Sequence, residues 1–130
     1  AFPTAGPDGR PIYHTNVLMG IASEYALVCL AAISDERRRD EVARRLGDSG
    51  RTVLDLTFGQ VADFAGNTIE LTGSSGRLLA LSQRAAAALT DEQRAVIEQS
   101  ATLLPLTVPT IEYAGGSVRC MIAGVHLTPR

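Results

Sequence analysis

The sequence contains little cysteine, little net charge and no long apolar run, and each shortage excludes a class of protein. Cys29 and Cys120 are the only two cysteines among 130 residues. They are too few for a disulfide framework and lack the paired spacing of a zinc site. A net charge of −2 does not provide the basic surface that nucleic acids or anionic membranes attract. All twelve basic residues are arginine, which we interpret as genome composition.

No apolar run approaches the roughly 20 residues of a membrane span, and no signal peptide opens the sequence. We therefore expect a cytoplasmic protein that binds neither nucleic acid nor membrane, and we expect no metal ion and no cofactor. A hydrophobic fraction of 45% with 20% charged residues is typical of a folded globular chain. The length fits one domain or a piece of one.

Proline and glycine are frequent in residues 1–11, which we interpret as a linker or loop before a domain at residues 12–130. Hydrophobic periodicity, capping residues and turn residues predict the elements of that domain. The predicted strands are 12–22, 25–33, 52–56, 68–71, 77–81 and 103–108. The predicted helices are 36–46 (closed by Gly47), 57–64, 83–89 and 90–101, with capping boxes at Thr57–Gln60 and Thr90–Gln93.

This order contains two successive ββαβ units of about fifty residues each, which predicts an α/β fold. One such unit cannot bury both faces of its sheet, whereas a stack or a ring of several units can. The charged run in the first long helix is predicted to be a solvated face.

Cys120 follows a glycine-rich loop, Ala114–Ser117, at the start of an apolar segment. A thiol at such a junction can be both rigidly held and accessible, since glycine lets a backbone approach a ligand closely. The alternative is that Cys120 is a small buried hydrophobic residue, as most free cysteines are. Cys29 lies in an apolar run, where a core position is expected.

His14 is a possible partner for this thiol. An imidazole next to a thiol favours the thiolate and can later act as a general acid or base. Catalytic Cys and His residues are adjacent in space and not in sequence, so their separation along the chain is no objection. One histidine and one cysteine alone are weak evidence.

Three segments together resemble the C-terminal half of the guanidine-modifying enzymes, a superfamily that includes arginine deiminases, amidinotransferases and dimethylargininases. The segments are Pro11–Val17, Gly66–Leu71 and Gly115–Ala123. The sequences of these segments are most similar to the arginine-deiminase-related, citrullinase-like branch. The resemblance covers nearly all of residues 10–127 and implies a pentein-like α/β propeller of five ββαβ modules around a central active site, with about two modules present here.

The resemblance implies a hydrolase of non-peptide C–N bonds. Cys120 would attack the central carbon of a guanidino or ureido group and form a covalent intermediate, and His14 would act as acid and then base. Ser117 and its neighbouring glycines would hold Cys120 in place, and Ser117 is also expected, with Asn16, to bind the substrate. Asn67 would line the substrate pocket, although it equally fits a turn residue with no further role.

The sequence departs from the superfamily pattern at two positions. Asn16 stands where several members have an aspartate that binds the guanidinium nitrogens, and a neutral amide suits a citrulline-like ureido group better. Gly124 stands where many members have an acidic residue.

The superfamily's other carboxylates belong to its N-terminal half. Asp55, Asp63 and Glu70 are candidates to replace them, but each also fits an ordinary surface position. We therefore expect the chain to pair with the N-terminal half of the same enzyme, or with itself, and to be inactive alone. Amidinotransfer on the same fold and a non-catalytic interaction module are the alternative functions; a cysteine protease fits less well.

Overall fold

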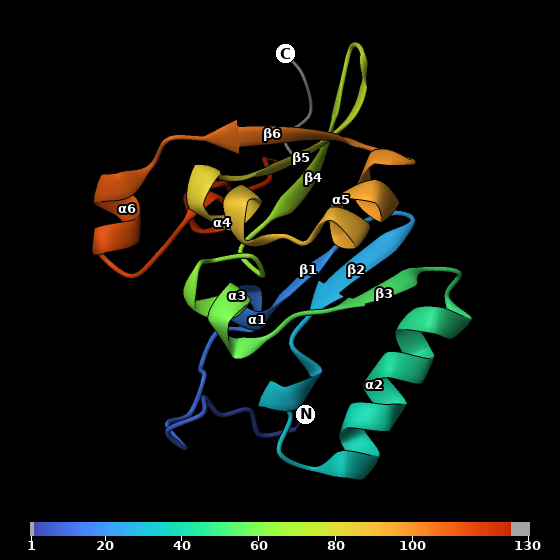
Figure 1. Cartoon of the computed structure of the whole chain (residues 1–130), viewed down its shortest axis with the longest axis vertical. Helices are drawn as coiled ribbons and strands as arrows, with labels where there is room; N and C mark the ends of the chain where they lie inside the picture. Colours follow the sequence, from blue (N-terminus) through green and yellow to red (C-terminus); the bar gives the residue numbers. More distant parts are fainter. Residues whose placement is uncertain (1, 126–130) are drawn as a thin grey trace.

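The computed structural model describes residues 2–125 and contains two small sheets, each of three strands (Figure 1). The first half of the chain forms these elements: α1 (Thr15–Leu18), β1 (Met19–Ile21), β2 (Tyr25–Val28), η1 (Leu30–Ala32), α2 (Glu36–Asp48) and β3 (Thr52–Asp55). The second half forms these: α3 (Phe58–Ala62), β4 (Ile69–Gly73), β5 (Gly76–Ser82), α4 (Gln83–Ala88), α5 (Asp91–Glu98), β6 (Thr102–Leu106), α6 (Pro109–Tyr113) and η2 (Val118–Met121).

Both sheets have the same topology. β1 pairs antiparallel with β2, which pairs parallel with β3; β4 pairs antiparallel with β5, which pairs parallel with β6. The helix between the parallel strands is α2 in the first sheet and the pair α4–α5 in the second. The α/β class is confirmed, and each half follows the predicted ββαβ order. The five-module propeller itself stays a prediction.

The prediction of two long strands before residue 34 was wrong. Residues 15–18 are helical, and strand pairing in β2 ends at Val28. One cause is visible at Leu30, whose backbone N–H donates to Asp55 Oδ1 at 3.0 Å and not to a neighbouring strand. The side chain of Asp55 thus helps to end the strand and begin η1.

Side-chain caps decide where most helices begin. Asp35 accepts from the N–H of Arg38 at the start of α2, and both predicted capping boxes, at α3 and α5, are present. Such a cap satisfies backbone donors that have no partner within the helix. The predicted end of α2 at Gly47 was wrong: the helix runs through Asp48, and Gly50 takes the left-handed conformation, with φ +84°.

One hydrophobic cluster extends through both halves. It includes Leu27 and Leu54 from the first sheet and Leu79 and Leu81 from the second. Cys29 is fully buried in this cluster, as predicted. Pro105 lies in the edge strand β6, where its missing N–H costs no ladder hydrogen bond.

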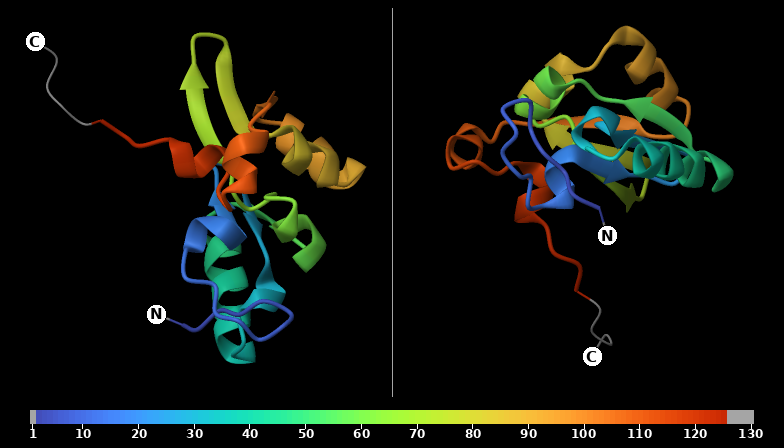
Figure 2. Two further views of the ribbon diagram at one scale, coloured as in Figure 1. Left: turned by 90° about the vertical axis from the view of Figure 1, so that its left-hand side faces the viewer. Right: turned by 90° about the horizontal axis from the view of Figure 1, so that it is seen from below.

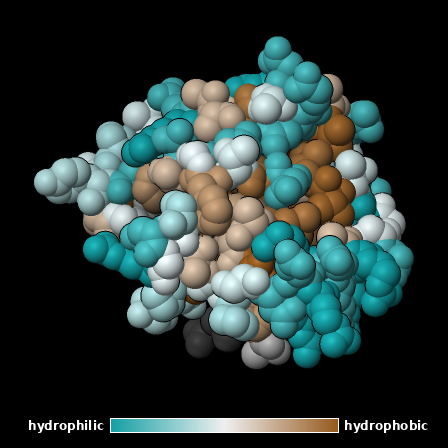
Figure 3. Space-filling view, turned by 60° about the horizontal axis from the view of Figure 1, so that its bottom comes forward, coloured by the Kyte–Doolittle hydropathy of each residue, from teal (hydrophilic) through white to brown (hydrophobic). Residues whose placement is uncertain are grey.

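Residues 2–11 lie against the first half of the fold. Thr4 forms an isolated bridge with Ile33, and Ala5 forms one with Pro11. Within residues 2–125, no helix is both long and apolar enough to cross a membrane. The space-filling view shows hydrophobic residues reaching the surface between hydrophilic regions (Figure 3). The predicted domain end at residue 130 lies outside the described residues.

Candidate active site

The thiol of Cys120 lies where three segments meet: the start of α1, the turn between α3 and β4, and η2. Figure 2 shows the red C-terminal segment beside the blue residues of α1. Hydrogen bonds join the three segments directly. Asn67 Nδ2 donates to Cys120 Sγ at 3.1 Å, and Asn16 Nδ2 donates to the same sulfur at 3.5 Å.

Asn67 is fixed by further bonds. Its Nδ2 also donates to the backbone oxygen of Asn16 at 2.9 Å, and its Oδ1 accepts from the backbone N–H of Cys120 at 3.3 Å. Asn67 is 1% exposed, whereas Cys120 is exposed. The sulfur can therefore be reached from outside, while one of the amides that contacts it is buried.

The turn that carries Asn67 is tightly constrained. Asn67 N–H donates to the backbone oxygen of Phe64 at 2.8 Å, and Phe64 has φ +64°, a left-handed conformation that is uncommon for a bulky residue. The guanidinium of Arg84 lies 5.5 Å from the centre of the Phe64 ring and pairs with Asp63. Strained residues of this kind persist only when their surroundings hold them.

Two glycines lie in the segments packed around the thiol, and one of them is required by the packing. A Cβ on Gly66 would lie 2.5 Å from the backbone oxygen of Val17, which is closer than van der Waals contact allows. A Cβ on Gly116 would lie 3.4 Å from Cys120 Cβ and 3.8 Å from its sulfur. Gly66 therefore lets the Asn67 turn contact α1, whereas a Cβ on Gly116 would make only ordinary van der Waals contact with Cys120.

Ser117 lies at the start of η2 and is fully buried. Its hydroxyl group bonds to Glu112 Oε1 at 3.4 Å, and its backbone oxygen accepts from Cys120 N–H at 3.1 Å. Ser117 thus supports the turn under Cys120. Sequence reasoning missed Glu112 and the helix α6 that carries it, although Pro109 at the first helical position was an available signal.

His14 is exposed and occupies the N-cap position of α1, two positions before Asn16, without a side-chain capping bond. Its backbone oxygen accepts from Val17 N–H. The described residues show no hydrogen bond between the His14 ring and Cys120. The structure therefore brings together Asn16, Asn67 and Cys120, with Ser117 beneath them, and places His14 on the segment that carries Asn16.

The carboxylates proposed as replacements have other partners. Asp55 accepts from Leu30 N–H, and Asp63 pairs with Arg84. Glu70 Oε1 accepts from the backbone N–H and the hydroxyl of Ser23. The side chains that bond to the Cys120 sulfur within residues 2–125 are amides.

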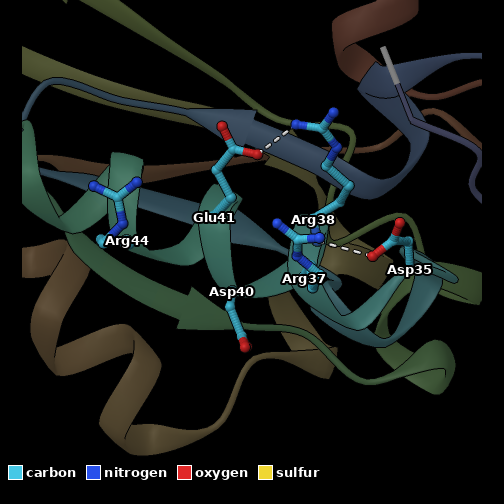
Figure 4. Close-up of a pocket in the computed structure, with 6 residues that line it drawn as sticks. All are labelled: Asp35, Arg37, Arg38, Asp40, Glu41 and Arg44. Atoms are coloured by element: carbon cyan, nitrogen blue, oxygen red, sulfur yellow. Dashed lines mark hydrogen bonds and ion pairs between the residues drawn. The ribbon is translucent and has the colours of Figure 1, made fainter.

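A hollow of about 560 Å³ lies elsewhere, along α2 (Figure 4). Its lining is charged and includes Arg38 and Glu41, which form an ion pair at 2.6 Å. This hydrogen bond from Arg38 lowers the pKa of Glu41. None of the candidate site residues lines this hollow, and the charged run has the solvated character predicted for it.

The two thiols differ in their surroundings. Burial raises the pKa of the Cys29 thiol, so Cys29 stays protonated and inert inside the core. Cys120 is exposed and accepts amide hydrogen bonds. The sulfur of Cys120 is therefore accessible and held by hydrogen bonds, whereas that of Cys29 is buried.

A family described as "N,N dimethylarginine dimethylhydrolase, eukaryotic" matches residues 1–127. The chain belongs to this family. The dimethylarginine dimethylhydrolases are guanidino-modifying hydrolases of C–N bonds with an α/β propeller fold. They are one of the three groups that the resemblance named, whereas the citrullinase-like branch stays a prediction. No curated protein and no solved structure matches the chain.

Proposed function

We propose that the protein hydrolyses the guanidino group of an N-methylated arginine through a covalent intermediate on Cys120. The observation that carries this proposal is the exposed Cys120 sulfur, which accepts hydrogen bonds from the amides of Asn67 and Asn16. Membership of the dimethylarginine dimethylhydrolase family supports the substrate class.

In the proposed reaction, the Cys120 thiolate attacks the guanidino carbon and a carbon–sulfur bond forms. The bond from this carbon to the methylated nitrogen breaks, and the nitrogen leaves with an added proton as a methylamine. Water then adds to the carbon, the carbon–sulfur bond breaks, and a ureido product leaves. His14 lies two positions before Asn16, which contacts the sulfur. It donates the proton that the leaving amine takes up and then accepts a proton from the attacking water.

The test follows both products and the intermediate. The purified chain, alone and together with an N-terminal half of the same enzyme, is incubated with N,N-dimethylarginine, and we measure released dimethylamine, the ureido product and the mass of any protein adduct. Cys120→Ser is expected to abolish all three signals, while Cys29→Ala, a matched loss of the other cysteine, retains them. Product formed at an unchanged rate by Cys120→Ser would contradict the proposal.

A ureido substrate is a second candidate, favoured by the Asn16 amide 3.5 Å from the sulfur. An uncharged amide both donates and accepts, so it fits a neutral citrulline-like group better than a guanidinium cation. Release of ammonia from citrulline, faster than release of dimethylamine from dimethylarginine, would select this candidate. A new guanidino compound formed only when an amine is added would indicate amidinotransfer.

We further propose that the active unit is completed either by an N-terminal half of the same enzyme or by a second copy of the chain. Support comes from the propeller fold of the family and from the amide-only side-chain partners of the sulfur. Substrate cations generally need carboxylates near the reacting carbon. A monomer in light scattering that turns over dimethylarginine alone would contradict this proposal.

A non-catalytic interaction module remains the alternative to an enzyme. It predicts that Cys120 reacts with iodoacetamide no faster at neutral pH than a free cysteine. Rapid alkylation of Cys120, with Cys29 protected in the folded protein, would exclude this alternative.

A further inference from the structure

The side-chain amide of Asn67 has no N–H left for a substrate. An asparagine amide has two N–H hydrogens and one oxygen. Here Nδ2 donates to Cys120 Sγ and to the backbone oxygen of Asn16, and Oδ1 accepts from Cys120 N–H. The Asn16 oxygen can only accept, so it determines which end of the amide carries the hydrogens.

The Asn67 side chain therefore forms hydrogen bonds with two groups of Cys120, its backbone N–H and its sulfur. The contact is buried on the Asn67 side, with 1% exposure. A backbone hydrogen bond supports the same contact, because Arg119 N–H donates to the Asn67 carbonyl at 3.4 Å. These bonds fix where the sulfur lies relative to α1 before any substrate binds.

A hydrogen bond donated to sulfur stabilises the negatively charged thiolate more than the neutral thiol. We propose that Asn67 is a positioning residue that orients Cys120 and stabilises its thiolate, and that it does not bind the substrate. This inference rests on the proposed function of Cys120 as the nucleophile. It replaces the sequence-based expectation that Asn67 lines the substrate pocket.

Two substitutions distinguish the bond to the Cys120 sulfur from the bond to the Cys120 backbone N–H. Asn67→Asp is nearly isosteric and keeps an oxygen for Cys120 N–H, but it replaces the donor to sulfur with a carboxylate that repels a thiolate. Asn67→Ala removes both bonds. Hydrogen bonds to a charged group contribute about 1.5–3 kcal/mol, and each 1.4 kcal/mol is a factor of ten in an equilibrium constant.

The measurement is the rate of Cys120 alkylation by iodoacetamide as a function of pH, in the full chain carrying Cys29→Ala. Alkylation forms a sulfur–carbon bond and releases iodide, and only the thiolate reacts appreciably. At pH 7 we expect Asn67→Asp to react roughly tenfold or more slowly than the parent, with Asn67→Ala in between. All rates should converge at high pH, where every variant is ionised.

Gln60→Ala is the matched control. Gln60 is another buried amide, and it hydrogen bonds to Ala88 and Gln93 and not to Cys120. This variant should lose stability without shifting the pH profile. An unshifted profile in both Asn67 variants, or an equal shift in Gln60→Ala, would overturn the inference.

The alkylation assay also separates this inference from the proposed function, because it needs no substrate. A shifted profile without any turnover of dimethylarginine, by the chain alone or together with an N-terminal half of the same enzyme, would support the positioning role of Asn67 and contradict the proposed substrate. Normal turnover combined with an unshifted profile would support the function and overturn the role of Asn67.

Discussion

Gly66 packs directly on the backbone of Val17, where a Cβ would lie 2.5 Å from the carbonyl oxygen. It would also lie 2.8 Å from the carbonyl carbon of Leu18. Because these are backbone atoms of α1, no side-chain rotation can relieve the contact. The distance between the Asn67 turn and the Asn16 segment is thus set by the absence of one methyl group.

Gly66→Ala should therefore damage both stability and the site. We expect a loss of about 1–3 kcal/mol in the free energy of unfolding, as for overpacked positions, and slower alkylation of Cys120. Urea denaturation and the alkylation rate measure the two effects. Gly47→Ala is the control: its Cβ meets nothing within 4 Å and it lies inside α2. It should stabilise the protein by about 0.5–1 kcal/mol, and a similar gain for Gly66→Ala would contradict the packing argument.

Alkaline pH should destabilise the fold through two buried groups. Burial raises the pKa of Tyr25, with Glu70 adding to the shift and Arg77 opposing it; burial also raises the pKa of Cys29. Both groups keep their protons in the folded state after the unfolded chain has lost them. Their stabilising contribution is complete below their ordinary values of 9.0 and 10.0 and declines as the pH rises above these values.

The measurement is the urea midpoint between pH 7 and 11. We expect a flat region followed by a decline above pH about 9. Tyr25→Phe should make the decline shallower. It should cost little at neutral pH, since the buried Tyr25 hydroxyl has no hydrogen-bond partner within the described residues. A large loss of stability in Tyr25→Phe at pH 7 would contradict the unpaired state of this hydroxyl.

Gln60 links α3 to the following helices. Its Nε2 donates to the Ala88 carbonyl at 2.9 Å and to Gln93 Oε1 at 2.7 Å, and its Oε1 accepts from Thr57 N–H. Gln60→Ala would remove all three bonds, although Gln93 Oε1 would still accept from Thr90 N–H, so we expect a loss of about 1–3 kcal/mol. Gln99→Ala, at the exposed end of α5, should change stability by less than about 0.5 kcal/mol. Equal effects in urea denaturation would contradict this reasoning.

Asn16→Asp should change substrate preference. A carboxylate near the sulfur attracts a guanidinium cation and gives no such advantage to a neutral ureido group. We expect the ratio of dimethylarginine to citrulline turnover to rise by about tenfold. Asn16→Ala is the control, since it removes the amide without adding charge. An unchanged ratio in Asn16→Asp would place Asn16 outside the substrate contacts.

The elements most predictable from the sequence are those decided locally. Capping residues such as Thr57 and Thr90 act on backbone groups within one turn, so both capping boxes follow from four adjacent residues. The second early strand was predicted too long in part because Asp55, distant in sequence, competes for the N–H of Leu30. Such a long-range hydrogen bond leaves no periodic signal.

The candidate site also combines features that the sequence predicts with features that only the fold determines. The sequence motifs identified Cys120, Asn16 and Asn67 as candidate site residues. In the structure, hydrogen bonds join these three residues. The sequence did not indicate whether the Asn67 side chain contacts the substrate or Cys120, because a glycine–asparagine turn is compatible with both. Only the three-dimensional arrangement shows that both N–H groups of Asn67 are occupied.

The three segments around the thiol have a consequence for synthesis on the ribosome. Asn16 and Asn67 are made well before Cys120, and the two sheets lie between and around them in the chain. A nascent chain can therefore fold most of its core before Cys120, the proposed nucleophile, has been synthesised. Cys120 meets the amides of Asn16 and Asn67 only after both sheets have been synthesised, so the contacts proposed to hold the thiol are among the last to form.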